Sequence, residues 1–165
     1  MIREATVNDS VRIAEIDVIS SRYAYKNIVP DEYLYKDLSV ENRMPVHRKW
    51  ISEKRFEVYV DEDSDTGIIR GMMGIGRCED DDKQGAFELH YLYVDPDYMR
   101  MGIGTGMLRF FEQKGIEKGC PEFVIWVLED NRPGRQFYEK NNYRSDGKEK
   151  IFRRWNKREI RYVKG

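Results

Sequence analysis

The sequence predicts an α/β fold in which helices cover the faces of a mixed β-sheet. Segments that alternate apolar and polar residues, as strands do, are interleaved with segments of helical periodicity. A continuous run of six apolar residues, Phe123-Val124-Ile125-Trp126-Val127-Leu128, is typical of a central strand covered on both faces. The 165 residues fit one domain, spanning 1–165, which is long enough to bury a substantial core.

The N-terminal part is predicted to be mainly helical. Residues 2–5 have the character of a short strand, and a helix follows them to about Tyr25. Residues 8–10, Asn-Asp-Ser, supply side chains that cap a helix N-terminus. A second helical segment is expected to open at residues 30–32, and a third to run from 39 to about 51.

Strand character dominates the middle of the chain. Residues 56–60 alternate apolar and polar side chains, as a strand does, and 68–75 and 87–94 are predicted to be the two strands that follow. Two acidic, glycine-ended segments, 61–67 and 79–85, separate these strands and predict turns.

The C-terminal part alternates helices and strands. A helix is predicted from about 104 to 118, with Gly119 as its C-terminal cap. Pro133 suits the first turn of a further helix after the apolar strand. Two last strands, near 143–152 and 158–163, would close the sheet.

The most informative motif is a glycine-rich segment between a strand and a helix. Gly102, Gly104 and Gly106 expose backbone N–H groups where the helix begins. Such N–H groups, together with the positive end of the helix dipole, bind anions, and a phosphate above all. The alternative is a tight turn without a ligand, although three glycines within five residues destabilise the start of a helix.

Two common phosphate-binding patterns are excluded by spacing. The dinucleotide-binding pattern G-x-G-x-x-G would need its third glycine at 107, which is Met107, and no acidic strand end follows about twenty residues later. The nucleoside-triphosphate loop needs a Gly-Lys-Ser/Thr sequence, which does not follow. Hydride transfer from NAD and nucleotide hydrolysis are therefore disfavoured.

The amino-acid composition restricts the binding partners and the cellular setting that we expect for the chain. The chain has 29 basic and 30 acidic residues, so its net charge of −1 predicts neither a nucleic-acid nor a membrane partner. No run of about 20 apolar residues and no secretory leader at residues 1–4 is visible. Cys78 and Cys120 lack metal-ligand spacing, so we expect no bound metal and a reducing, cytoplasmic setting.

Two motifs together resemble the GNAT family of N-acetyltransferases. Residues 92–98 followed by Gly102-Ile103-Gly104 resemble its acetyl-CoA-binding motif, Q/R-x-x-G-x-G/A. Residues 126–131 and then 137–143 resemble its second cofactor motif, an Asn followed by Phe-Tyr-Glu-Lys and a terminal aromatic. The family's usual Gln or Arg is Met99 here, and Gly134 and Asn142 replace a common Ala and Gly.

The resemblance implies a binding mode for acetyl-CoA on a mostly antiparallel, twisted sheet of about seven strands. The pantetheine arm would pair with the backbone of Leu92, Tyr93 and Val94, where the central strands splay apart to form the acetyl-CoA cleft. An N–H near Leu92 or Tyr93 would polarise the thioester carbonyl. The pyrophosphate would lie against the segment that begins the helix: Arg100, Met101, Gly102, Ile103, Gly104 and Thr105. Asn131 would contact pantetheine, cap the following helix, or do both.

The resemblance also implies catalytic roles in a direct ternary complex. Glu88, fourteen residues before Gly102, matches the spacing of the general base in family members that acetylate histones. Strand alternation places His90 on the same face, and the ordinary histidine pKa of about 6.5 makes it a rival base. Tyr138 matches the general acid that protonates the departing thiolate. Ordinary structural roles are the alternatives: an ion pair for Glu88, a strand histidine for His90 and a packed aromatic for Tyr138.

The acceptor is the least determined part of the function. We expect a small-molecule primary amine, with a polyamine-like one suggested by the acidic runs Asp61–Asp65 and Glu79–Asp82 and by the tyrosines Tyr23, Tyr25, Tyr33 and Tyr35. Solvated turns and ordinary packing are the alternatives for these residues. A protein N-terminus or lysine is the alternative acceptor, and a non-catalytic acyl-CoA-binding module is the alternative function. The resemblance also allows a homodimer.

Overall fold

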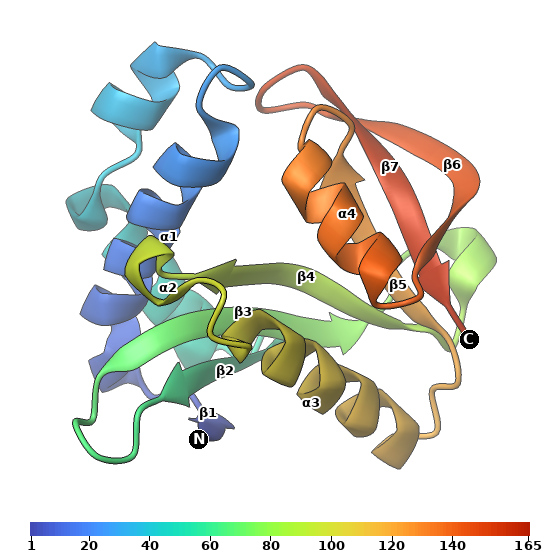
Figure 1. Cartoon of the computed structure of the whole chain (residues 1–165), viewed down its shortest axis with the longest axis horizontal. Coiled ribbons are helices and arrows are strands. Elements are labelled where there is room, and N and C mark those ends of the chain that lie inside the picture. Colours follow the sequence, from blue (N-terminus) through green and yellow to red (C-terminus); the bar gives the residue numbers. More distant parts are fainter.

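A seven-stranded sheet in the order β1-β2-β3-β4-β5-β7-β6 organises the computed structural model, which describes residues 1–165 (Figure 1). Its strands are β1 Ile2–Glu4, β2 Glu57–Glu62, β3 Ile69–Arg77, β4 Phe87–Val94, β5 Phe123–Leu128, β6 Arg144–Phe152 and β7 Lys157–Lys164. Every neighbouring pair is antiparallel except β4 and β5, which run parallel. The predicted fold class, a mixed and mostly antiparallel sheet flanked by helices, is confirmed.

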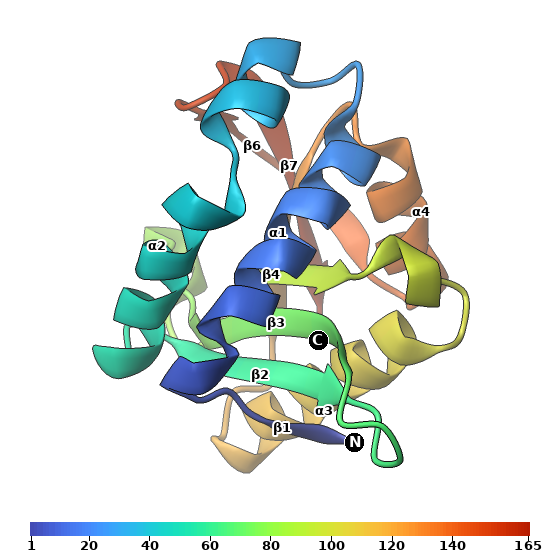
Figure 2. The same ribbon diagram turned by 90° about the vertical axis from the view of Figure 1, so that its left-hand side faces the viewer.

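Four helices flank this sheet. They are α1 Ser10–Tyr25, α2 Val40–Ser52, α3 Ile103–Glu117 and α4 Arg132–Lys140. Helices α1 and α2 lie on one face of the β1–β4 half, whereas α3 lies on the other (Figures 1 and 2). Shorter helical turns form at Val7–Asp9, Tyr33–Asp37, Asp81–Lys83 and Pro96–Tyr98. None of the helices has the length and apolar character needed to cross a membrane.

The helix ends agree with most of the capping signals. The Ser39 side chain caps α2 by accepting from the Asn42 N–H at 3.2 Å, and Gly119 ends α3 with a φ of +74°. The expected cap from residues 8–10 at α1 is wrong, because no side chain caps the first N–H groups of α1. Asp9 instead accepts from the Thr6 N–H at 2.7 Å, which stabilises the helical turn before α1.

Strands β4 and β5 hydrogen-bond along only part of their length. The parallel register joins Phe87, Glu88 and Leu89 to residues 123–125, and no pairing continues beyond it. A β-bulge lies at the same place, because Gly74 is opposite Tyr91 and Ile75 is opposite Leu89, which leaves His90 unpaired. The two strands therefore splay apart directly after the bulge, as the resemblance predicted.

The bulge also determines which side chains of β4 face each layer. Leu92 and Val94 pack with the core beneath α3, whereas Tyr91 and Tyr93 pack with the core on the α1 and α2 side. Because one residue is inserted, Glu88 shares its face with these two tyrosines. Polar and aromatic groups thus gather on the face of β4 that α1 and α2 cover.

Helix α3 packs most closely where β4 and β5 are still paired. Phe111 lies 5.4 Å, between ring centroids, from both Phe87 and Phe123. Gly115 contacts the same rings, and a Cβ there would lie 2.5 Å from Phe123 and 3.0 Å from Phe87. This contact holds the paired end of the strands, so the opening is confined to their other end.

We predict that Gly115→Ala destabilises the chain by about 1–3 kcal/mol, because the added methyl overpacks a rigid aromatic cluster. Gly106→Ala in the same helix is the matched control, since a Cβ at Gly106 meets nothing within 4 Å. That control should be neutral or stabilising by up to about 1 kcal/mol. Urea unfolding of both variants measures the difference, and equal midpoints would contradict the packing argument.

Candidate active site

A cleft of about 1050 Å³ opens where β4 and β5 separate. It is lined by every predicted cofactor-binding residue except Met101: Leu92, Tyr93, Val94, Arg100, Gly102, Ile103, Gly104, Thr105, Asn131 and Tyr138. Of the predicted catalytic residues, Tyr138 and His90 line the cleft and Glu88 does not. Residues far apart in the sequence thus meet in one site, as the two motifs predicted.

The N-terminus of α3 presents free backbone donors to this cleft. The first helical hydrogen bond runs from the Gly106 N–H to the Gly102 carbonyl at 2.9 Å, so the N–H groups of residues 103–105 have no partner within the helix. Gly102 has a φ of +81°, and Arg100 a φ of +62°, which is costly for a residue other than glycine. The geometry is that of an anion site built from backbone N–H groups.

Two members of the glycine-rich segment lie outside the cleft. The Met101 side chain is 64% exposed and does not line it. Gly106 faces open space and its N–H is already bonded, so its lack of a side chain is not needed for close approach of a ligand. Gly102 and Gly104 are the glycines that line the site.

Beyond the bulge, β4 offers an open backbone edge. Leu92 and Tyr93 pair with Met73 and Met72 of β3, but no residue of β5 lies in register opposite them. Hydrogen-bonding groups on that side of the strand are therefore available to an extended ligand. The Val94 carbonyl at the end of the strand is occupied, because Ser20 Oγ donates to it at 3.0 Å.

Asn131 stands at the N-terminus of α4, where the strand after the splay ends. Its Oδ1 accepts from the Gly134 N–H at 3.1 Å, so the helix-cap role is present and the amide nitrogen stays available. A Cβ at Gly134 would lie 2.6 Å from Asn131 Nδ2, so the glycine that departs from the family pattern makes room for this arrangement.

Tyr138 lies in the cleft as a protonated phenol. Burial, reinforced by Tyr25, raises its pKa above the ordinary value of a phenol. No hydrogen bond from another residue contributes to that pKa. A neutral phenol that is free to donate has the state that a general acid requires.

Glu88 is held by His90 outside the cleft. His90 Nδ1 lies 3.3 Å from Glu88 Oε1, and the Glu88 side chain is only 13% exposed. Burial alone would raise the pKa of Glu88, but the hydrogen bond and charge of His90, with the charge of Lys150, hold it below its ordinary value. The expected shared face of Glu88 and His90 is present, although the ion pair makes Glu88 a weak proton acceptor.

The cysteines supply no activated nucleophile. Both Cys78 and Cys120 are free thiols. Burial, with a smaller contribution from the Glu88 charge, raises the pKa of the Cys78 thiol to about 12. A thiol in this state does not attack a thioester readily at neutral pH.

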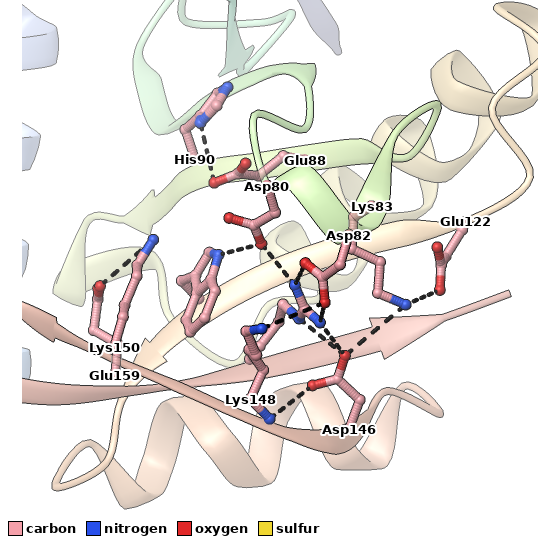
Figure 3. Close-up of polar contacts among 12 residues, drawn as sticks. Asp80, Asp82, Lys83, Glu88, His90, Glu122, Asp146, Lys148, Lys150 and Glu159 are labelled. Atoms are coloured by element: carbon pink, nitrogen blue, oxygen red, sulfur yellow. Dashed lines mark hydrogen bonds and ion pairs between the residues drawn. The ribbon is translucent and has the colours of Figure 1, made fainter.

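The acidic runs lie outside the cleft, and several of their carboxylates are ion-paired. Asp61 and Asp63 accept from Arg70 at 2.7–3.0 Å. Asp80 and Asp82 converge with Asp146 on the buried guanidinium of Arg161, which donates to them at 2.7–3.0 Å (Figure 3). The argument that these turns attract a polyamine therefore loses its support.

The tyrosine-rich segment contributes to the cleft in part. Tyr23, Tyr25 and Tyr33 line it, whereas Tyr35 is 52% exposed and lies beside Arg22. The rings of Tyr25 and Tyr33 lie 5.3 and 5.2 Å from Trp155, at the tip of the β6–β7 hairpin. An aromatic wall thus joins α1 and the segment after it to the β6–β7 hairpin tip.

Several polar residues of the cleft were missed by the sequence analysis. They are Glu159 on β7 and the buried group of Asp17, Arg43 and His47 on α1 and α2. Burial would raise the pKa of Asp17, but the His47 hydrogen bond and the Arg43 charge lower it. Alternation in β7 put Glu159 on the polar face with Arg161, and no local signal indicated that this face borders a cleft.

The family model described as the acetyltransferase (GNAT) family matches residues 22–143. The chain therefore belongs to the GNAT acetyltransferase family and is an acyltransferase. Membership confirms both the enzyme class and the acyl donor, acetyl-CoA, that the two motifs predicted.

Individual relatives agree with this assignment. The chain is similar to an uncharacterized N-acetyltransferase, YuaI of Bacillus subtilis (strain 168), with 28% identity over 138 residues, which is 84% of this chain and 76% of the relative. It has the fold of a GCN5-related N-acetyltransferase from Rhodopseudomonas palustris, with a TM-score of 0.79 at 16% identity, covering 100% of this chain and 94% of that one. It also has the fold of the PaiA N-acetyltransferase from Thermoplasma acidophilum, solved with coenzyme A, with a TM-score of 0.75 at 19% identity and coverage of 98% and 96%.

We predict that Arg161→Gln lowers the melting temperature at pH 7 by roughly 5 °C and flattens its dependence on pH. Arg161 lowers the pKa of Asp82, and it outweighs the effect of burial on the pKa of Asp146. Carboxylates with lowered pKa values stabilise the folded state above pH ~4, and this contribution disappears as the pH falls through their folded pKa values.

Thermal unfolding between pH 2 and pH 8 measures both effects. Arg158→Gln on the same strand is the control, because its side chain is 50% exposed and its ion pairs are long. If the melting temperature of Arg161→Gln depends on pH as that of wild type does, the ion pairs of Arg161 do not stabilise the fold.

Proposed function

We propose that the chain transfers the acetyl group of acetyl-CoA to a primary amine by direct attack in a ternary complex. The observation that carries the proposal is the continuity of one cleft from the free N–H groups of α3, along the open edge of β4, to Tyr138. These three parts suit, in order, the pyrophosphate, the pantetheine arm and the thioester.

Acetyl-CoA, the acyl donor, would be bound mainly by backbone groups of the chain. The N–H groups of residues 103–105, together with the helix dipole, would bind the pyrophosphate, and Arg100 adds charge at the rim. The free edge at Leu92 and Tyr93 would pair with the pantetheine amides and present an N–H to the thioester carbonyl. Such a donor stabilises the oxyanion that forms during attack by ~3 kcal/mol.

Direct transfer requires an amine nucleophile and an acid for the leaving group. A raised pKa keeps the Tyr138 phenol protonated until the thiolate leaves. The Cys78 thiol, with its pKa of about 12, does not favour a covalent acyl-enzyme. Attack of the amine on the bound thioester therefore needs no covalent intermediate.

The enclosure of the acceptor side favours a small amine over a protein chain. Trp155 packs against Tyr25 and Tyr33, and Arg154 Nη1 donates to the Tyr33 hydroxyl at 3.2 Å. These contacts connect the β6–β7 hairpin tip to α1 and the segment after it, which lie side by side in Figure 1, and so enclose this part of the cleft. A single amine fits this opening more readily than an extended polypeptide.

We expect purified protein to release CoA from acetyl-CoA only when a primary amine is present, with small amines giving the highest kcat/KM. A thiol-release assay over monoamines, polyamines, amino acids and peptides with free N-termini measures this preference. A faster reaction with peptides would reject the small-amine acceptor. Tight acetyl-CoA binding without release by any amine would support the non-catalytic alternative.

Tyr138→Phe should lower kcat by about 10²-fold while leaving the Kd for acetyl-CoA nearly unchanged, because only the proton donor is removed. Steady-state kinetics and calorimetric titration separate the two quantities. Tyr35→Phe is the control, since Tyr35 is 52% exposed and does not line the cleft. Unaltered turnover in Tyr138→Phe would remove Tyr138 as the acid.

A further inference from the structure

Two carboxylates line the cleft, Asp17 and Glu159, and their surroundings differ. Asp17 is fully engaged: it accepts from Arg43 Nε at 2.6 Å and from Ser21 Oγ at 3.3 Å, and His47 Nε2 lies 2.8 Å away. A carboxylate held in this way is a structural anion. The His47 hydrogen bond and the Arg43 charge lower its pKa, so Asp17 is a poor proton acceptor.

Glu159 has no such partners. It lies on β7 opposite Leu128, the last residue of β5, where the splayed strands border the acceptor side. Its nearest cation is Lys150 Nζ, at 3.9 Å, beyond hydrogen-bond distance (Figure 3). The Lys150 ammonium lies 4.0 Å from the ring centroid of Trp126, so it is partly occupied elsewhere. The Glu159 side chain is 14% exposed and lines the cleft.

Charged and titratable groups act on Glu159 from three elements. Lys150 of β6 lowers its pKa, whereas Glu88 of β4 raises it, and burial is the largest effect and raises it further. Tyr25 of α1 lies within range, because the Glu159 charge contributes to the raised pKa of that phenol. The same Tyr25 raises the pKa of Tyr138, and Glu159, Tyr25 and Tyr138 all line the cleft.

We infer that Glu159 is the residue that binds the ammonium group of the acceptor amine and removes its proton. The inference rests on the proposed function and assigns within it the role that the sequence suggested for Glu88 or His90. Aromatic rings suited to a cation line the same cleft: Tyr25 and Tyr33 pack on Trp155. The ligand class is a small primary amine that arrives as an ammonium ion.

Glu159 and Tyr138 together account for every proton that moves in the proposed reaction. One ammonium proton passes to the Glu159 carboxylate, and the amine lone pair forms a C–N bond at the thioester carbonyl. The C–S bond breaks, its electron pair leaves with sulfur, and the thiolate takes the Tyr138 proton. The second nitrogen proton returns to the Tyr138 phenolate. The products are the amide and CoA thiol, and Glu159 releases its proton to water.

The contrast with Glu88 explains why Glu159 suits the role. An alkylammonium has a pKa near 10.4, so a carboxylate with a raised pKa accepts its proton more readily than one with a lowered pKa. Glu88 has the lowered pKa, is bonded to His90 and lies outside the cleft. Burial and the absence of a partner give Glu159 the opposite properties.

Glu159→Gln is the first test, with kcat/KM for the best amine measured against pH. We expect kcat/KM to fall ~10²-fold or more at neutral pH. The acidic limb of the pH profile, on which the wild-type rate falls as Glu159 becomes protonated, should disappear. The Kd for acetyl-CoA should not change. Glu149→Gln is the matched control on the same hairpin, because its side chain is 49% exposed and does not line the cleft; it should keep the wild-type profile.

Glu88→Gln separates the two carboxylates. If Glu159 is the base, Glu88→Gln keeps the acidic limb and moves it slightly to lower pH, because the Glu88 charge no longer raises the pKa of Glu159. Loss of the limb in Glu88→Gln, with a normal limb in Glu159→Gln, would overturn the assignment in favour of Glu88. Normal limbs in both variants would also overturn it.

The melting temperature of Glu159→Gln shows whether the variant is still folded. A raised folded pKa means that the ionised carboxylate opposes folding at neutral pH, so Glu159→Gln should melt at the same temperature as wild type or higher. A marked drop in melting temperature would give Glu159 a structural role and overturn the proposal. If wild-type protein releases no CoA with any amine, the proposed function fails and this assignment fails with it. An active wild type with an unaffected Glu159→Gln rejects the assignment alone.

Discussion

The limited pairing of β4 with β5 is the constraint on which the site depends. Parallel hydrogen bonds join them only at residues 87–89 and 123–125, and the aromatic contact of α3 with Phe87 and Phe123 fixes that end. Beyond it, each strand keeps its outer neighbour, so the sheet stays continuous while its centre opens. The opening leaves an unpaired edge of β4 in the interior, and such an edge is satisfied when an extended ligand takes the place of a strand.

The two halves of the sheet on either side of this opening are stabilised differently. On the α1 and α2 side, β2 and β3 bury apolar residues such as Val58, Val60 and Met72. On the same face of β7, Arg161 is buried among three carboxylates from the β3–β4 loop and β6 (Figure 3). This cluster ties the loop before β4 to the β6–β7 hairpin on the other side of β5. An acidic turn that reads as a solvated segment in the sequence is therefore a connection between the two halves.

The sequence predicted the parts of the site that lie in contiguous motifs. Gly102, Gly104, Asn131 and Tyr138 all line the cleft, because the helix starts and strand ends that position them are local features. Glu159 was not predicted, since its importance depends on a neighbour in β5 and on a splay that no window of sequence contains. The acidic turn at residues 79–85 was misread for the same reason: the partner of Asp80 and Asp82, Arg161, follows them by about eighty residues. Local chemistry is readable from sequence, whereas pairing across the sheet is not.

Unpaired polar groups of the fold concentrate around the cleft. The buried side-chain atoms without a hydrogen-bond partner in the chain are His47 Nδ1, Tyr91 Oη and Trp155 Nε1, and all three residues line it. Leaving such an atom unpaired costs about 1–3 kcal/mol, and a carboxylate such as Glu159 without a bonded partner adds to that cost. Outside the cleft, Arg161 and Asp61 are paired at 2.8 Å, so the chain has the means to satisfy buried charge. Three unpaired polar side chains line one cleft, where a polar ligand would pair with them, and this supports the proposed acceptor site.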